Sequence, residues 1–195
     1  MNAVTPSDDS LARLERLGAT AQQLLDRCRA RGASQAEVSC SEEHGLNVNV
    51  RMGAVETVEA TRDRGIAVTV YFGQRKGSAS TADLREESLD ATVEQACAIA
   101  RHTEDDIAAG LADPALMATD LREFDSWHPW AMDADRAIDL ALACESAGRE
   151  DARIENSDGA SVGSGESLSV YANSHGFSGS SGVGRGRWFV GAASP

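Results

Sequence analysis

The clearest pattern in this sequence is an alternation of apolar and polar residues between residues 36 and 80. It begins at residues 36–41, where Val38 and Cys40 alternate with polar neighbours, and it returns at residues 46–51, 55–61, 66–72 and 78–80. Such alternation predicts strands with one buried face, and Met52-Gly53 and residues 73–77 predict the turns between them. We expect a mostly antiparallel meander of short strands, with the most apolar one, residues 66–72, at its centre.

Three other stretches repeat their apolar residues at helical spacing. They span residues 11–31, 84–102 and 133–148, with N-cap candidates at residues 7–10, at Asp83, and at Asp133 or Asp135. The third helix places Glu145 on its polar face. Residues 104–131 have no single period and predict a long ordered connection, which Trp127 and Trp130 pin to the body.

Two more strands are predicted after the third helix. Residues 153–157 begin the first, Asp158-Gly159 is a hairpin signal, and residues 166–172 alternate again before a turn at residues 173–176. Together the elements predict an α+β fold, a two-layer sandwich of a mostly antiparallel, twisted sheet with helices packed on one face. We expect a disordered start at residues 1–10, one domain at residues 11–179, and an irregular Gly-rich and Ser-rich tail at residues 180–195.

Charge narrows the possible partners. The 195 residues carry 18 basic and 31 acidic side chains, for a net charge of −13, which opposes contact with nucleic acid. The start has no cationic segment leading into an apolar one, and no run of eighteen apolar residues follows, so we expect a cytoplasmic protein without a membrane partner. In that compartment disulfides are rare, and we expect free thiols at Cys28, Cys40, Cys97 and Cys144.

No catalytic constellation is evident in the sequence. The histidines stand apart, without a His-Glu-x-x-His zinc motif, and lie at His44, His102, His128 and His175. The segments at residues 163–165 and 176–180 do not complete the Gly-x-Ser-x-Gly elbow of a serine hydrolase, and residues 182–186 lack a Walker ending. We therefore assign no catalytic residue, metal ligand or cofactor to this chain.

A small basic turn is the best candidate for a contact surface. Arg75, Lys76 and Ser78 follow one another closely in an acidic protein, and their donors suit a carboxylate or a partner's acidic side chain. A solvated hairpin tip is the alternative interpretation. With Asn173 and His175 from the later turn, these residues are the predicted partner or substrate contacts.

Three motifs, in order along the chain, carry a resemblance to a known family. They are GIAVTVY at residues 65–71, RKGSASTADL at residues 75–84 and ANSHG at residues 172–176. With the Trp127-His128-Pro129 connection, they resemble the amino-terminal domain of the PmbA family, also called TldE, over roughly residues 11–179.

This resemblance implies a partner subunit of TldD peptidases. The family's complex is cytoplasmic and bacterial and degrades unfolded or extended peptides, including a microcin precursor whose leader it trims. The zinc belongs to the TldD subunit, whose His-Glu motif lies in its carboxy-terminal domain, and PmbA proteins lack that motif. The family is also named modulator of DNA gyrase, although this acidic sequence shows no surface for nucleic acid.

We therefore predict a subunit portion that is non-catalytic by itself and that provides subunit interface and substrate-groove surface. Its expected partners are a TldD-like subunit, which would hold the zinc, and an extended peptide. The alternatives are a free-standing interaction domain or degenerate remnant, and an independent hydrolase. Because family members continue well beyond the 173–177 segment, a truncated or frameshifted product would explain the tail and leave an exposed sheet edge.

Overall fold

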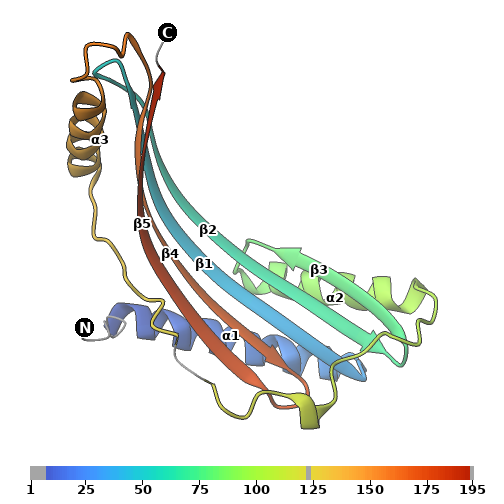
Figure 1. Ribbon diagram of the computed structural model, residues 1–195. Helices are drawn as coiled ribbons and strands as arrows, with labels where there is room; N and C mark the ends of the chain where they lie inside the picture. Colours follow the sequence, from blue (N-terminus) through green and yellow to red (C-terminus); the bar gives the residue numbers. More distant parts are fainter. Residues whose placement is uncertain (1–7, 122–123, 194–195) are drawn as a thin grey trace.

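The computed structural model describes residues 8–121 and 124–193, and in this part of the chain three α-helices lie against a long, bent sheet (Figure 1). The helices are α1 Asp8–Ala30, α2 Glu86–His102 and α3 Ala134–Gly148, and a short 3₁₀ turn spans Pro114–Leu116. The strands are β1 Gln35–Arg51, β2 Ala54–Phe72, β3 Arg75–Thr81, β4 Asn156–Asn173 and β5 Ser178–Ala193. Of the predicted disordered start, residues 1–7 lie outside the described residues, and residues 8–10 form the first turn of α1.

The strand order confirms the predicted α+β architecture. Within the described residues the strands run β3-β2-β1-β4-β5, and every neighbouring pair is antiparallel. The central strand is β1, so the prediction that residues 66–72 lie at the centre is wrong. Residues 66–72 are the part of β2 that β1 and β3 flank on both sides, which explains why this segment is the most apolar.

The strands are longer than the sequence pattern predicted. Residues 36–41 and 46–51 belong to one strand, β1, and residues 55–61 and 66–72 belong to one strand, β2. The glycines between these segments do not interrupt the strands, because Gly45 pairs with Thr61 and Gly65 pairs with Ser41. These two glycines therefore lie within continuous strands, and the prediction of short strands is wrong.

The predicted hairpin at Asp158-Gly159 is also wrong. Both residues lie inside β4, where the β4–β5 register shifts between Ser157 and Gly159. The φ angle of Gly159 is +100°, and a Cβ there would lie 2.3 Å from the carbonyl oxygen of Val50. This glycine therefore forms a bulge that lets β4 pass close to β1, and it does not reverse the chain.

One face of the sheet carries the core. Val38 and Cys40 at one end of β1 pack beneath α1 and α2, whereas Val48 and Val50 at the other end pack beneath α3. Figure 1 shows α1 and α2 along the lower half of the sheet and α3 along the upper half. The prediction of helices on one face is confirmed, and we call the opposite, mostly polar surface the open face.

The helix starts show which capping predictions hold. Asp133 caps α3 as predicted, since its carboxylate accepts a hydrogen bond of 2.8 Å from the Arg136 amide. At α2 the N-cap residue is Arg85, so the predicted start at residue 84 is slightly early. Asp83 lies just outside the helix, and its carboxylate accepts hydrogen bonds from the Arg85 amide and from the Ser88 hydroxyl.

The predicted irregular tail is wrong over the residues that the structure describes. Residues 178–193 form β5, which pairs with β4 along nearly its whole length. Its glycines at residues 182, 184 and 186 face the connection between α2 and α3. A Cβ on Gly184 would lie 2.6 Å from the Pro129 nitrogen, and one on Gly186 would lie 2.0 Å from Trp130 Cε3. The Gly-rich composition therefore makes room for this connection, and Trp127 is buried as the sequence predicted.

Glu145 is buried and does not lie on a polar face, which corrects the prediction for α3. Its two carboxylate oxygens accept hydrogen bonds of 2.7 and 2.8 Å from the amides of Met52 and Gly53, both of which have positive φ. Burial by itself would raise the pKa of Glu145, but hydrogen bonds from Ser157 and these two amides hold it below its ordinary value. This carboxylate thus fastens the β1–β2 hairpin tip to α3.

Three of the four cysteines are small, buried core residues. Cys28, Cys40 and Cys97 are buried, Cys144 is partly buried, and all four are free thiols. Burial raises the pKa of Cys28 to about 12 and that of Cys40 to about 11. None of the described helices has both the length and the apolar character that crossing a bilayer requires.

The fit between β5 and the connection predicts the effect of a single methyl group. Gly184→Ala should lower the free energy of unfolding by about 1–3 kcal/mol, because the new Cβ collides with the backbone of Pro129. Urea denaturation measures the loss. Gly18→Ala in α1 is the matched control, since its Cβ meets nothing within 4 Å, and it should stabilise the protein by about 0.5–1 kcal/mol. A Gly184→Ala protein of unchanged stability would show that β5 is not packed in this way.

The Glu145 clamp predicts a pH-dependent stability. Glu145→Gln should cost about 1–3 kcal/mol at neutral pH, because it removes the charged acceptor that the Met52 and Gly53 amides share. Since the folded pKa is lower than the ordinary 4.5, this stabilisation is present above pH 4.5 and is lost as the pH falls through the folded value. Thermal melts of both proteins should converge in acid. The exposed Glu150→Gln serves as the control, and a constant difference between the curves at all pH values would contradict the clamp.

Candidate functional site

The residues predicted as contacts gather at one end of the sheet. Ser78 on β3 pairs with Thr69 on β2, Thr69 pairs with Glu37 on β1, and Glu37 pairs with Asn173 on β4. The four positions thus form one row across four strands. Residues distant in the sequence are brought together here, as the prediction of a shared contact surface requires.

A carboxylate held by two tyrosines lies in this row. Tyr71 Oη donates to Glu37 Oε1 at 3.0 Å, and Tyr171 Oη donates to Glu37 Oε2 at 2.7 Å. Burial first, and then the Glu37 carboxylate that accepts its hydrogen bond, raise the pKa of Tyr71 to about 12. The pKa of Tyr171 is raised as well, mainly by burial. The arrangement holds three strands together by side-chain bonds on the open face.

Asn173 and His175 organise the turn between β4 and β5. Asn173 is 2% exposed, and its Oδ1 accepts hydrogen bonds from the amides of His175 and Phe177. The His175 ring lies 3.3 Å from the side-chain nitrogen Nε2 of Gln35 and 3.2 Å from the backbone carbonyl oxygen of Ala112. Both side chains therefore hold the α2–α3 connection and the sheet end in place, and contact with a partner stays a prediction for them.

Arg75, Lys76 and Ser78 are more accessible. Arg75 donates to the carbonyl oxygen of Arg101 at 3.2 Å, and its Nε lies 3.7 Å from the Asp105 carboxylate. Lys76 is exposed, with its ammonium 6.0 Å from the centre of the Tyr71 ring. Arg75 also borders an open hollow between the β2–β3 turn and the end of α2. This corner of the molecule presents basic and acidic groups side by side.

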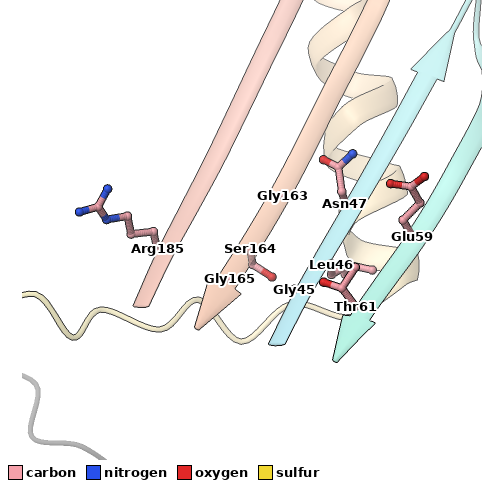
Figure 2. A pocket seen from close by; sticks show the side chains of 9 residues that line it. All are labelled: Gly45, Leu46, Asn47, Glu59, Thr61, Gly163, Ser164, Gly165 and Arg185. Carbon is pink, nitrogen blue, oxygen red and sulfur yellow. The ribbon is translucent and has the colours of Figure 1, made fainter. Parts of the chain in front are cut away.

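A second feature, which the sequence did not reveal as a site, lies midway along the strands. A shallow depression with a volume of about 320 Å³ opens over Gly45, Gly163 and Gly165. Figure 2 shows Arg185 on one side of it and Glu59 and Thr61 on the other, with the glycines and Asn47 between them. The sequence shows Gly163-Ser164-Gly165, but only the β1–β4 pairing shows that Gly165 lies opposite Gly45.

A third feature is the outer edge of β2. The short strand β3 pairs only with residues 66–72, so residues 54–65 have no strand partner on that side within the described chain. Val55 and Val58, at 44% and 46% exposure, lie along this length. An exposed strand edge offers unpaired backbone donors and acceptors to another extended chain.

The described side chains do not fit a zinc ion. No group of three or more His, Cys, Asp or Glu side chains gathers there in a way that could hold a metal. His44 lies on β1, His102 ends α2, His128 lies in the connection, and His175 lies in the β4–β5 turn. Ser164 lies within β4, not at a strand-to-helix elbow, so its surroundings differ from those of a hydrolase nucleophile.

Solved structures show the class of fold. TldE from Thermococcus kodakarensis superposes with a TM-score of 0.78 at 15% identity, over 90% of this chain and 39% of that one. A protein from Bacteroides thetaiotaomicron, described as a modulator of DNA gyrase, gives 0.75 at 23% identity, over 84% of this chain and 38% of that one. At these identities the likeness establishes the fold, a bent α+β sheet with one open face.

Sequence comparison goes further. The family models described as PmbA/TldA metallopeptidase domain 1 and PmbA/TldA metallopeptidase central domain match residues 36–100 and 127–194. A metalloprotease PmbA homolog from Haemophilus influenzae is 46% identical over 74% of this chain, and metalloprotease PmbA from Escherichia coli O157:H7 is 43% identical over 72%. The chain belongs to the PmbA/TldD family, which confirms the resemblance seen in its motifs. It spans 32% of the length of each of these two relatives.

The paired tyrosines predict a measurable titration. Tyr71 and Tyr171 are the only tyrosines of the chain, so tyrosinate absorbance reports on them alone. Glu37→Gln should move the higher midpoint from about 12 toward 10, because it removes the negative charge beside both phenols. Since the folded pKa of Tyr71 is raised, its stabilisation is present below pH 10 and is lost as the pH rises through the folded value. Glu43→Gln on the same face is the control, and equal shifts in both variants would contradict the assignment.

Proposed function

We propose that this chain is the amino-terminal part of a PmbA/TldE-type subunit that works with a TldD-like zinc peptidase. In this proposal it contributes subunit interface and substrate-groove surface, and the partner supplies the zinc and the bond cleavage. Family membership supports the link to peptidases. The lack of a metal-holding side-chain group among the described residues is compatible with leaving the chemistry to the partner.

The observation that carries the proposal is the unpaired outer side of β2 at residues 54–65. An extended peptide that adds to a strand edge is held mainly by backbone hydrogen bonds, so binding tolerates many side-chain sequences. The clamp between Glu145 and the hairpin tip fixes one end of this edge, and β3 bounds the other end. The edge is therefore a preformed surface, which lowers the cost of ordering it on binding.

The basic corner at Arg75 and Lys76 is our proposed contact with the partner subunit. It lies at the far end of β3 from the open edge, since Arg75 pairs with Phe72 and Thr81 pairs with Ile66, so a subunit seated there would extend along β3 to reach a peptide bound along β2. Exposed cations of this kind direct association and orientation more than they add to affinity. This division places the partner contact and the peptide contact on neighbouring parts of one sheet.

Reconstitution with a TldD-like subunit tests the proposal. The mixture should elute as a complex in size-exclusion chromatography, and it should cleave an extended peptide. Val55→Lys with Val58→Lys should leave the complex intact and raise the KM for that peptide about fivefold, because lysines on an edge oppose strand addition. Leu140→Lys on α3, with a similarly exposed leucine, is the matched control. A free chain that never joins the partner would instead support a separate interaction domain.

A further inference from the structure

The depression at the middle of the open face has charges of opposite sign on its two sides. In one row across the sheet Arg185 pairs with Gly165, Gly165 pairs with Gly45, and Gly45 pairs with Thr61. In the next row Gly163 pairs with Asn47, and Asn47 pairs with Glu59. An exposed cation on the edge strand β5 and an anion on β2 therefore lie on opposite sides of β4 and β1, one row apart (Figure 2).

The side chains that border this depression have unused hydrogen-bonding capacity. Arg185 and Glu59 are exposed, and neither forms an ion pair or side-chain hydrogen bond with any described residue. This differs from the sheet end, where Glu37, Asn173 and His175 are all engaged within the chain. The border of the depression is thus polar, charged at both ends and free to bind.

The floor of the depression lets another backbone approach closely. Glycines within strands often mark such places, and Gly165 leaves its part of the floor open, since an added Cβ there would meet only the His44 carbonyl oxygen, at 3.8 Å. At Gly45 an added Cβ would lie 2.7 Å from Thr61 Oγ1, and at Gly163 one would lie 3.3 Å from Asn47 Oδ1. The side chains of Thr61 and Asn47 therefore reach over the glycines, where their polar atoms can meet the amide groups of a bound chain.

The span between the charges selects a ligand length. Three inter-strand spacings of about 4.8 Å separate β5 from β2, or about 14 Å in all. An extended peptide rises about 3.3 Å per residue, so a peptide of about four residues reaches across, whereas a dipeptide does not. Its terminal ammonium would meet Glu59, and its terminal carboxylate would meet Arg185.

We propose that this depression binds short peptides with free termini, laid across the strands with the carboxylate on Arg185 and the ammonium on Glu59. The inference rests on the proposed function, in which the chain handles peptides, and it adds a second peptide site apart from the β2 edge. Such a site would hold short peptides of the size that cleavage of an extended chain releases.

Titrations with short peptides test the site without the partner subunit. Tetraalanine titrated into the isotope-labelled chain should shift the amide signals of Gly45, Gly163 and Gly165 in NMR spectra, and dialanine should bind more weakly. Arg185→Gln and Glu59→Gln should each weaken tetraalanine binding about threefold, the usual size for an exposed charge pair. Arg136→Gln and Glu87→Gln, on exposed helix positions, are the matched controls and should change nothing.

The caps then identify which terminus each residue meets. A carboxamide cap removes the negative charge of the peptide's carboxyl terminus, so Arg185→Gln should not weaken binding of that peptide further. An acetyl cap removes the positive charge of the amino terminus, so Glu59→Gln should not weaken binding of that peptide further. Gly165→Ala should reduce binding without unfolding, since its Cβ meets only the His44 carbonyl oxygen, at 3.8 Å.

Two results would overturn the inference. One is that capped and free tetraalanine bind equally well, and the other is that no peptide shifts these glycines. Neither result bears on the proposed function, because complex formation and the effect of the β2 edge variant on KM are measured separately with the partner present. Loss of complex formation together with normal tetraalanine binding would contradict the proposed function and would support the peptide site.

Discussion

The ladder between β1 and β4 is the interaction on which the rest of this structure depends. It runs from the pair Glu37–Asn173 at one end to Val50–Ala160 at the other. The two matching family regions contribute one strand each to this ladder, since β1 lies in residues 36–100 except for Gln35, and β4 lies in residues 127–194. Both regions therefore share a single sheet, and neither completes the open face alone.

The register of this ladder decides the character of both faces. With Val38 opposite Ala172 and Cys40 opposite Val170, the apolar residues of the two strands meet beneath the helices. With Gly45 opposite Gly165, the glycines meet on the open face. A slip by one residue would send the core outward and fill the depression with side chains, so the core specifies the site.

The sequence predicted the elements well where local chemistry determines them. Helical spacing and the Asp133 cap located α3, and alternation located the apolar halves of β1 and β2. It failed where a residue's role depends on a distant partner. Gly45 and Gly65 resemble turn residues in isolation, but their strand partners hold them extended.

The misassigned tail shows the same limitation. In the sequence 182–186 the alternate glycines lack any apolar period, so no local rule predicts a strand. The glycines do alternate as the inward-facing residues of a strand would. They carry no side chains because Trp127, Pro129 and Trp130 of the connection fill the space on that face. Glu145 is a comparable case, since its helical position is ordinary and its burial comes from the amides of the hairpin tip.

The sequence likewise predicted one part of the candidate site and missed the other. The motifs at residues 75–84 and 172–176 indicated one end of the sheet, where the structure brings Ser78 and Asn173 into one row with Glu37. Most polar groups of that row are satisfied within the chain, which suits a rigid support. The depression between Arg185 and Glu59 forms no single sequence motif, because its four strands contribute one to three residues each. Its polar groups face solvent unpaired within the described chain, which suits binding. In the proposed function, the supporting end and the depression lie on one open face that would hold peptides while another subunit acts on them.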